Sequence, residues 1–374
     1  MGRRDRGMAR LSAAPDYDRF ARWPRGAARA ALVFTALVLL AAVWTAPAPS
    51  VPRPTAPAAA PAPATAQRDY DLQLYDRIAE RVAAGENYYA AAVSEQRARN
   101  FPVRPAIAVR LPTLAYLTAW IGRTGLFGLA IVLALGILAA WWRRLGEEPG
   151  GADRRIVALL LLAIGSLIAL KPQYLAQHEV WAGLLLALGG GLHRPGKWRA
   201  AWLPVALALA VRELALPFAL LLAALAAWRK DWRELAAWLV LIALFAAGLA
   251  WHLHEVGKYL LPNDRNSPPW LVLRGLPGLS GNIVDSSVLH LLPARLAAPL
   301  ALLPLLGWAA WKSPAGRFFA LLFAGYGLLF MIAGRANNFY WALVVTPAWF
   351  VGYAFLPMAL RSLVSSARGR VAGA

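Results

Sequence analysis

Two aspartates, Asp69 and Asp71, stand at the start of a short amphipathic pattern beyond the first apolar run of this 374-residue chain. Apolar side chains at 72, 74, 75, 78, 79 and 82 fall mostly on one helical face, which predicts a helix lying on a membrane surface. A carboxylate held there beside aromatic residues such as Tyr75 is suited to act as a general base for a hydroxyl. The structural alternative is an N-cap, a common use of Asp at the start of a helix.

Other polar side chains interrupt or border the long apolar stretches. The stretch 156–192 must turn at Lys171-Pro-Gln-Tyr-Leu-Ala-Gln-His-Glu179, and the stretch 200–228 must turn near Arg212-Glu213. Ionisable groups close to a membrane carry a large desolvation cost and therefore point to functional sites. We take as candidate ligand-binding residues Tyr75, Arg110, Lys171, His178, Glu179, Arg212, Glu213, Arg335, Asn337 and Asn338.

The arginines among these candidates suit a phosphate ligand, because guanidinium matches phosphate oxygens and stays charged. Arg212 is the first candidate, and Arg335, Lys171 and Arg110 are further ones. The alternative for Arg212 is an internal ion pair with glutamate that locks two broken helices. The turn that carries Asn337, Asn338, Tyr340 and Trp341 can hydrogen-bond and stack on a sugar, or it can belong to an interfacial aromatic belt.

Composition favours an integral membrane protein over a soluble one. Hydrophobic residues make up 59% of the chain and charged residues 16%, whereas soluble domains are about 45–50% apolar. A net charge of +20 is also typical of proteins that bind nucleic acids. Here, however, the arginines lie in short loops beside apolar runs, where they set the orientation of the chain in the membrane. We therefore expect no nucleic-acid partner. The lack of cysteine excludes disulfides, thiolate metal sites and a cysteine nucleophile.

The positive-inside rule predicts the threading of the chain through a bilayer. Four basic clusters should face the cytoplasm, namely Arg143/Arg144 with Arg154/Arg155, then Arg194 to Arg199, then Arg229 to Arg233, and Lys312 with Arg317. The chain must then turn back between successive clusters. We expect an all-α polytopic protein with about ten transmembrane helices (range 8–11), some of them short or broken, and both ends in the cytoplasm.

The same threading predicts the division of the chain. We expect a basic cytoplasmic tail (1–29), a first anchor rather than a cleaved signal peptide (30–46), a Pro/Ala-rich linker (47–66), an extracytoplasmic loop with interfacial helices (67–123), a transmembrane core (124–360) with an irregular outer loop (254–295), and a cytoplasmic tail (361–374). All candidate site residues then fall on the extracytoplasmic face, so we expect them to meet in one pocket.

The first loop resembles that of the C-type membrane glycosyltransferases (the GT-C superfamily), in their mannosyltransferase-like branch. The resemblance rests on Asp71-Leu-Gln-Leu-Tyr75, followed by small residues, a glycine and Tyr88. It implies a polytopic enzyme that takes sugar from a polyprenyl-phosphate donor, with its essential carboxylate in the first extracytoplasmic loop. The matching position is Asp71, with Asp69 as a second candidate. The linker 47–66 departs from the family pattern, because it separates this carboxylate from the first span.

The leading hypothesis is a glycosyltransferase of the bacterial inner membrane. It would transfer sugar, with inversion, from a polyprenyl-phosphate-sugar donor to a lipid or glycan acceptor at the extracytoplasmic face. We expect no organic cofactor, although Asp69 and Asp71 offer oxygen ligands to a divalent cation. The rival hypotheses are a transporter or flippase of lipid-linked saccharides, since broken helices with embedded charges also build transport sites, and a cell-envelope assembly protein.

Overall fold

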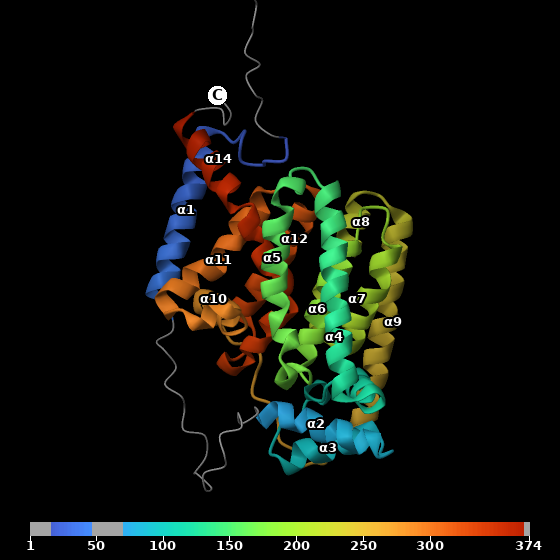
Figure 1. The fold of residues 1–374 in the computed structure, drawn as a ribbon. Helices are drawn as coiled ribbons and strands as arrows, with labels where there is room; N and C mark the ends of the chain where they lie inside the picture. Colours follow the sequence, from blue (N-terminus) through green and yellow to red (C-terminus); the bar gives the residue numbers. More distant parts are fainter. Residues whose placement is uncertain (1–15, 47–69, 370–374) are drawn as a thin grey trace, which may run out of the picture.

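The computed structural model describes residues 16–46 and 70–369, without the side chains of residues 70, 71, 169 and 170. Every regular element in these ranges is a helix, and extended backbone forms only isolated bridges. The fold is therefore all-helical, as predicted (Figure 1). The predicted linker 47–66, the predicted base candidate Asp69 and most of the N-terminal tail lie outside the described residues.

Four helical stretches of the described chain are long and apolar enough to cross a membrane. They are α1 (Arg25–Trp44), α4 (Thr113–Glu147, with the short helix η1, Ala106–Ala108, before it), α9 (Trp232–Gly257) and α12 (Pro314–Ile332). A bent pair, Thr346–Ala354 with Leu356–Arg368, makes a fifth if it is counted as one span. This number is smaller than the ten helices expected from the sequence.

The difference arises where polar segments break the apolar stretches. The stretch 156–192 forms α5 (Arg155–Ser166) and α6 (His178–Leu192), joined by the short helices η3 (Leu167–Leu170) and η4 (Pro172–Tyr174). The stretch 200–228 forms α7 (Arg199–Val211) and α8 (Leu216–Trp228), joined by η5 (Glu213–Ala215). Both predicted turns are confirmed. Each of these helices is shorter than the roughly 20 residues that a straight span requires.

The C-terminal third departs further from the prediction. The end of the predicted transmembrane core, residues 340–360, is not one continuous helix but consists of η7 (Ala336–Val344), α13 (Thr346–Trp349), η8 (Phe350–Ala354) and the start of α14 (Leu356–Arg368). Its backbone packs directly on α11 (Ala294–Ala310): a Cβ added at Gly352 would lie 2.1 Å from the Pro304 carbonyl oxygen. This close approach, with Pro347 and Pro357 at helix starts, explains the break.

The outer loop predicted as irregular contains a helix, α10 (Gly275–Asp285), followed by η6 (Val288–Leu291). Its sequence, Gly-Leu-Pro-Gly-Leu-Ser-Gly, disfavours a helix by propensity. Packing reverses this preference, because α10 buries Leu279, Ile283 and Val284 and because Gly278 lets it approach the Phe330 carbonyl of α12. Tertiary contacts therefore decide the structure of this segment.

The predicted basic clusters gather at one end of the helical body. Arg194 pairs with Glu147 at 2.6 Å, Arg229 pairs with Glu234 at 2.9 Å, and Glu234 also accepts the Gly196 N–H. The loop between α4 and α5, with η2 (Ala152–Arg154), lies beside the start of α12, where the Ala315 N–H donates to Glu148. This end is at the top of Figure 1.

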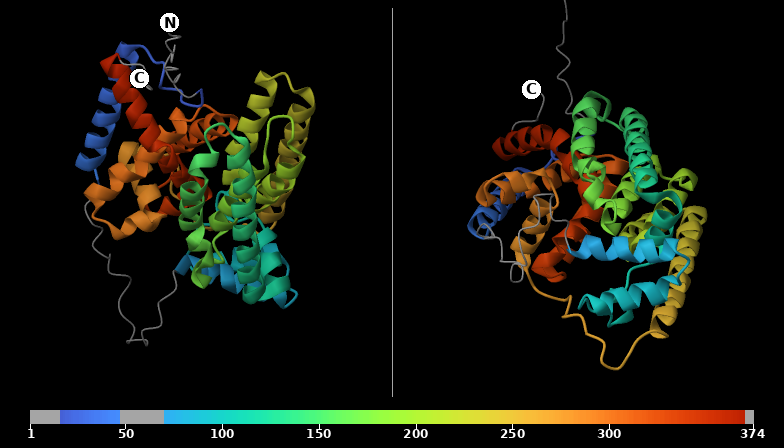
Figure 2. Two further views of the ribbon diagram at one scale, coloured as in Figure 1. Left: turned by 45° about the horizontal axis from the view of Figure 1, so that its top comes forward. Right: turned by 60° about the horizontal axis from the view of Figure 1, so that its bottom comes forward.

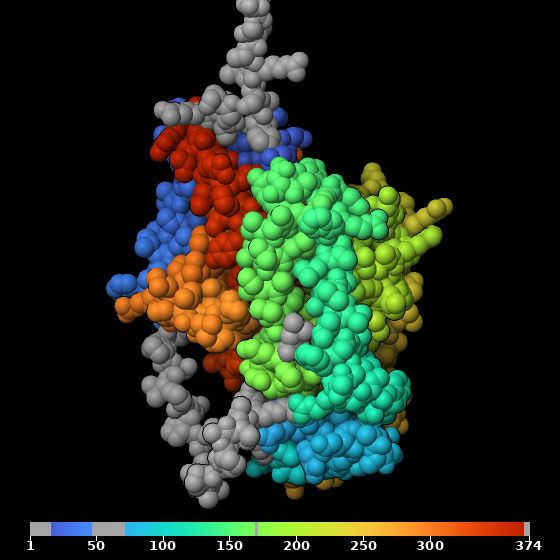
Figure 3. All heavy atoms as spheres, viewed as in Figure 1, coloured from blue at the N-terminus to red at the C-terminus, as the bar shows by residue number. Residues whose placement is uncertain are grey.

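A cap covers the opposite end of the body. It consists of α2 (Tyr70–Ala83), α3 (Tyr88–Ala98) and the irregular segment 258–274, which passes beside α3 (Figures 1, 2 and 3). The predicted amphipathic helix is confirmed as α2, which buries Leu72, Leu74, Ile78, Ala79 and Val82. Several of these side chains form a small core separate from that of the body, with Tyr88, Tyr89 and Val256.

Candidate functional site

An open cavity of about 860 Å³ lies between the cap and the body. It is lined by α2, by the segment that follows α3, by the turn between α7 and α8, by the segment 258–274 and by the start of η7. Seven of the predicted site residues line it: Tyr75, Arg110, Arg212, Glu213, Arg335, Asn337 and Asn338. Segments distant in the sequence thus meet in one pocket, but the expectation that all candidate residues do so is not met, because Lys171, His178 and Glu179 do not line it.

Helix α2 brings the first-loop motif to this cavity. Tyr75 lines the cavity wall, and Asp71 is the second residue of the same helix, one helical turn earlier. Residues four positions apart lie on the same face of a helix. The backbone of Asp71 is therefore on the same face of α2 as Tyr75, which lines the cavity. Asp71 lies inside the helix rather than before it, and Asp69 lies outside the described residues. The side chain of Asp71 is not described.

A buried ion-pair network holds the turn between α7 and α8. The Arg212 Nε atom lies 2.6 Å from Glu179 Oε1, and Arg212 Nη1 pairs with Glu213. Glu179 also accepts a hydrogen bond of 2.6 Å from Gln177. Arg212 and Glu179 are almost completely buried, and Glu213 is partly exposed to the cavity. This is the internal pair that the sequence analysis named as the structural alternative, since both carboxylates compensate the Arg212 charge.

The outer turn before η7 holds Arg335 at the cavity wall. The Arg335 backbone N–H donates to Asn338 Oδ1 at 3.0 Å, and Asn338 Nδ2 donates to the Tyr340 hydroxyl at 3.0 Å. The Arg335 Nη1 atom donates to Ser267 Oγ and to the Pro268 carbonyl. Among the described residues, Arg335 has no carboxylate partner and its buried Nε–H has no acceptor. Asn337 is exposed in the same wall.

Arg110 lies next to this turn. Its Nε atom donates to the Tyr75 hydroxyl at 3.2 Å, and its Nη2 atom is 3.5 Å from the Tyr340 hydroxyl. Tyr340 therefore links Arg110 to the Asn338 side chain that fixes Arg335. No described carboxylate forms an ion pair with Arg110. The guanidinium groups of Arg110 and Arg335 thus both line the cavity, and neither forms an ion pair within the described part of the chain.

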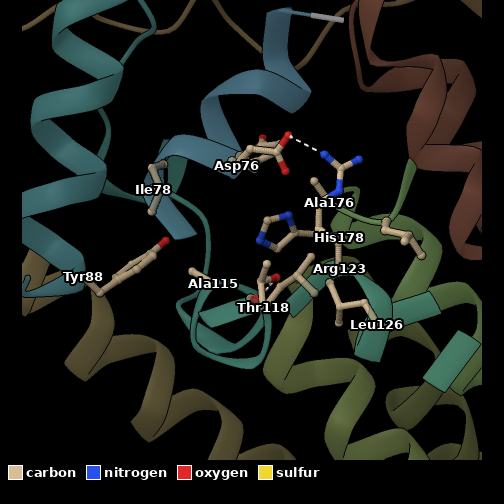
Figure 4. Close-up of a pocket in the computed structure, with 12 residues that line it drawn as sticks. Asp76, Ile78, Tyr88, Ala115, Thr118, Arg123, Leu126, Ala176 and His178 are labelled. Carbon is tan, nitrogen blue, oxygen red and sulfur yellow. Dashed lines mark hydrogen bonds and ion pairs between the residues drawn. The ribbon is translucent and has the colours of Figure 1, made fainter. Parts of the chain in front are cut away.

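A second, much smaller pocket lies on the other side of Tyr75 (Figure 4). His178 is buried in its wall, with its ring 4.9 Å from the Tyr75 ring, and its Nδ1 atom has no partner among the described residues. Asp76 and Arg123 form an ion pair of 3.8 Å across the pocket. His178 therefore supports the Tyr75 wall from behind. Lys171 is exposed near this pocket and lines neither cavity, so the structure does not bring it to the others.

Polar contacts fix the cap over the cavity. Arg97 at the end of α3 binds Asp264 with two hydrogen bonds of 2.6 and 2.9 Å, and this guanidinium lowers the pKa of the Asp264 carboxyl. The Tyr88 hydroxyl donates to the Arg110 carbonyl at 2.5 Å, and burial raises the pKa of Tyr88 above its ordinary value. Tyr88 therefore stays protonated and positions the backbone of Arg110.

Two arginines of the cavity wall are not among the residues predicted from the sequence. Arg99 follows α3 and pairs with Glu95 at 3.3 Å, and Arg265 lies in the segment 258–274. Neither arginine belongs to a distinctive sequence motif. They lie at the cavity only because the second outer loop folds under α3. Trp341, whose buried indole N–H has no acceptor in the described structure, also lines it.

Within the described residues, no three His, Asp or Glu side chains gather as a metal site. The Asp69/Asp71 pair, which the sequence analysis considered as cation ligands, lies outside the described side chains. Comparison with protein-family models, curated proteins and solved structures gave no match.

Proposed function

We propose that this protein is a membrane glycosyltransferase of the C-type class that takes sugar from a polyprenyl-phosphate donor. One observation carries the proposal: the first-loop helix with Asp71 borders an open cavity in which Arg110 and Arg335 have no carboxylate partner among the described residues. Cations without internal partners attract an anionic ligand, and arginine matches the oxygens of a phosphate. A volume of about 860 Å³ is within the range of small-molecule sites.

The donor phosphate binds between Arg110 and Arg335 in this proposal. Arg212 has less charge to offer because Glu179 and Glu213 already compensate it, so its main role is to hold the turn between α7 and α8. The sugar lies toward Asn337, Asn338 and Trp341, where amide groups and an indole N–H are available for its hydroxyls. Tyr75 and Tyr340 orient the Arg110 guanidinium.

The reaction is a displacement at the anomeric carbon. Asp71 accepts the proton of an acceptor hydroxyl, and the hydroxyl oxygen attacks the anomeric carbon from the side opposite the phosphate. The bond between the anomeric carbon and the phosphate oxygen breaks, and polyprenyl phosphate leaves with the electron pair. The product is a glycoside with inverted configuration. Arg110 and Arg335 stabilise the negative charge that develops on the leaving phosphate.

We further propose that the end with the basic clusters faces the cytoplasm and the cap faces outward. Lysine and arginine concentrate in the cytoplasmic loops of membrane proteins, and this end carries all four basic clusters. Both termini are then cytoplasmic, and the chain is a multi-pass protein of the bacterial inner membrane. The polyprenyl chain of the donor lies in the membrane, while the acceptor reaches the cavity beneath the cap.

The test is transfer of labelled hexose from a polyprenyl-phosphate donor in membranes that contain the full chain, its Asp71→Asn variant or the matched Glu80→Gln variant. Glu80 is on the same helix, is exposed, pairs with Arg77 and lines neither pocket. We expect Asp71→Asn to lower the rate of glycoside formation by about 10²-fold or more, and Glu80→Gln to leave it unchanged.

Normal transfer by the Asp71→Asn variant, at equal expression, would remove the proposed base. Movement of lipid-linked sugar across the membrane without a glycosidic product would instead identify a transporter. Asp69→Asn, tested in parallel, decides which of the two aspartates is required.

A further inference from the structure

Glu213 is the one carboxylate among the described side chains that line the large cavity. It is the first residue of η5, and Leu214 beside it also lines the cavity, with its carbonyl held by the hydroxyl of Tyr326. The side chain of Glu213 is 23% exposed, whereas that of the neighbouring Arg212 is almost completely buried. The fold therefore presents this carboxylate to the cavity from a fixed backbone.

The burial of Arg212 is already explained without Glu213. The Arg212 Nε atom lies 2.6 Å from Glu179 Oε1, and Gln177 donates to the other oxygen of Glu179, also at 2.6 Å. Glu179 is almost completely buried, so it is the partner that a buried arginine requires. Glu213 is a second carboxylate beside the same cation. The ion pair with Glu179 therefore leaves the presence of Glu213 unexplained.

One oxygen of Glu213 is available to a ligand. Its Oε1 atom accepts from Arg212 Nη1, which fixes the direction of the side chain. Its Oε2 atom has no hydrogen-bond or ion-pair partner in residues 16–46 and 70–369. A carboxylate oxygen has two lone-pair sites for donors. The cavity wall thus offers a hydrogen-bond acceptor of fixed orientation.

Glu213 lies close to both groups that hold the donor in the proposed function. Helix η5 packs against η7, the element that carries Asn338 and Trp341 on the proposed sugar side. Arg110, on the proposed phosphate side, interacts electrostatically with Glu213 without forming an ion pair with it. A sugar that is joined to this phosphate and directed toward Trp341 therefore lies beside the available oxygen of Glu213.

A carboxylate at this place distinguishes between the groups that a sugar carries. An ionised carboxylate only accepts hydrogen bonds, so it binds a hydroxyl group, whereas an ether or ester oxygen has no hydrogen to donate to it. Hydrogen bonds to an ionised acceptor are also stronger than those between neutral groups. A sugar that lacks the hydroxyl would displace water from the carboxylate and offer no donor in return, which weakens its binding.

We infer that Glu213 is a specificity-determining residue whose available oxygen accepts a hydrogen bond from one ring hydroxyl of the transferred sugar. The inference rests on the proposed function and adds a substrate class to it, namely a neutral sugar with an unmodified hydroxyl group facing η5. Sugars that are deoxygenated, methylated or acylated at that position lose this bond. A sugar with an acidic group at that position meets a like charge.

The test is calorimetric binding of hexose 1-phosphates to the full chain in neutral detergent. Glucose, mannose and galactose 1-phosphates are compared first, and the tightest ligand is then compared with its analogues that each lack one hydroxyl. Glu213→Gln keeps an oxygen acceptor for Arg212 and removes the charge, so it should weaken binding of the parent ligand by about fivefold to tenfold. Glu80→Gln, an exposed position of α2 outside both pockets, is the control and should not change binding.

The deoxy analogues separate recognition from a structural role. One analogue should bind to the unmodified protein with a similar loss of about fivefold to tenfold, and Glu213→Gln should not weaken the binding of that analogue further. If Glu213 only positions Arg212, Glu213→Gln should weaken the parent ligand and every analogue by the same factor, which would overturn the inference. Glu213→Asp, which keeps the charge but withdraws the oxygen, gives the same comparison if Glu213→Gln does not fold.

Other outcomes overturn different parts of the account. Equal binding of all hexose 1-phosphates to Glu213→Gln and to the unmodified protein means that Glu213 does not contact the sugar. The same conclusion follows if farnesyl phosphate binds and no hexose 1-phosphate does. If neither kind of ligand binds, the proposed function itself fails. A loss of sugar transfer by Glu213→Gln of about 10²-fold at saturating donor, with unchanged binding, would identify a catalytic base instead.

Discussion

Arginine has different surroundings at the two ends of the helical body. At the end with the basic clusters, buried Arg144 donates to Glu148 at 3.2 Å and to the Gly190 carbonyl, and Arg229 pairs with buried Glu234. At the cavity end, Arg110 and Arg335 contact hydroxyl and carbonyl groups but, among the described residues, no carboxylate. Arg144 and Arg229 thus join helices at the first end. The second leaves cations available, which we attribute to a ligand.

Tryptophan shows the same contrast. In the body, Trp141 donates its indole N–H to the Ala187 carbonyl, Trp308 donates to the Trp349 carbonyl, and Trp349 donates to the Ala301 carbonyl. Trp341 at the cavity is 9% exposed, and its buried N–H has no acceptor in the described structure. Buried polar groups normally have a partner, so Trp341 Nε1 and Arg335 Nε are the two donors of this cavity that the ligand of the proposed function would satisfy.

The arginine contrast predicts the largest difference in stability. Arg144→Met should lower the free energy of unfolding by about 3–5 kcal/mol, because it leaves the buried Glu148 without its cation. Arg335→Met should lower it by less than about 1 kcal/mol, because no carboxylate in the described chain depends on Arg335. Both values can be measured by unfolding in detergent. Equal losses would mean that Arg335, too, is a structural residue.

The tryptophan contrast predicts a smaller effect. Trp308→Phe should destabilise the protein by about 1–3 kcal/mol, since the Trp349 carbonyl loses its buried donor. Trp341→Phe removes a donor without a described partner, so stability should be unchanged or slightly higher. The Trp341→Phe substitution should instead weaken binding of a hexose phosphate by about fivefold. A stability loss in Trp341→Phe with unchanged binding would contradict a ligand role for this indole.

The ion pair between Arg97 and Asp264 in the cap predicts the smallest effect on stability, and this effect depends on pH. Because Arg97 lowers the pKa of Asp264 in the folded protein, the pair contributes stability above the ordinary aspartate pKa of about 3.9. That contribution, about 1 kcal/mol, is lost as the pH falls through the lowered folded value. Proteolysis of the segment 258–274 should therefore accelerate at acid pH. The Asp264→Asn variant lacks the ion pair with Arg97 at every pH. Its segment 258–274 should therefore be cleaved faster than that of the unmodified protein at neutral pH, and the cleavage rate should depend less on pH.

The sequence predicted the elements whose pattern is local. Helix α2 follows from apolar spacing, and the breaks at 171–177 and at Arg212 follow from charges inside apolar stretches. Helix α10 did not follow, since its glycines and proline oppose a helix and only packing against α12 compensates. The broken segment after Tyr340 carries Pro347 and Pro357 as local signals, but its breaks depend also on the contact of Gly352 with α11, which the sequence does not reveal.

The sequence was sufficient to predict several residues of the site, but not which of those residues form ion pairs with one another. Charge placement identified Arg110, Arg212 and Arg335, because each stands beside an apolar segment. Nothing in the spacing distinguishes Arg212, which two glutamates compensate, from Arg110, which contacts tyrosines. Arg265 was missed because its loop reaches the cavity only by passing beside α3. The difference between a structural and a ligand-binding arginine therefore appears only in three dimensions.

The most direct test of this account is equilibrium binding of farnesyl phosphate to the full chain and to variants at both ends. Arg110→Gln with Arg335→Gln should weaken binding by about 10²-fold with little change in melting temperature. Arg194→Gln, at the opposite end, should bind as the unmodified protein does. Unchanged affinity in the double variant, or an equal loss in Arg194→Gln, would show that the uncompensated arginines of the cavity are not a phosphate site.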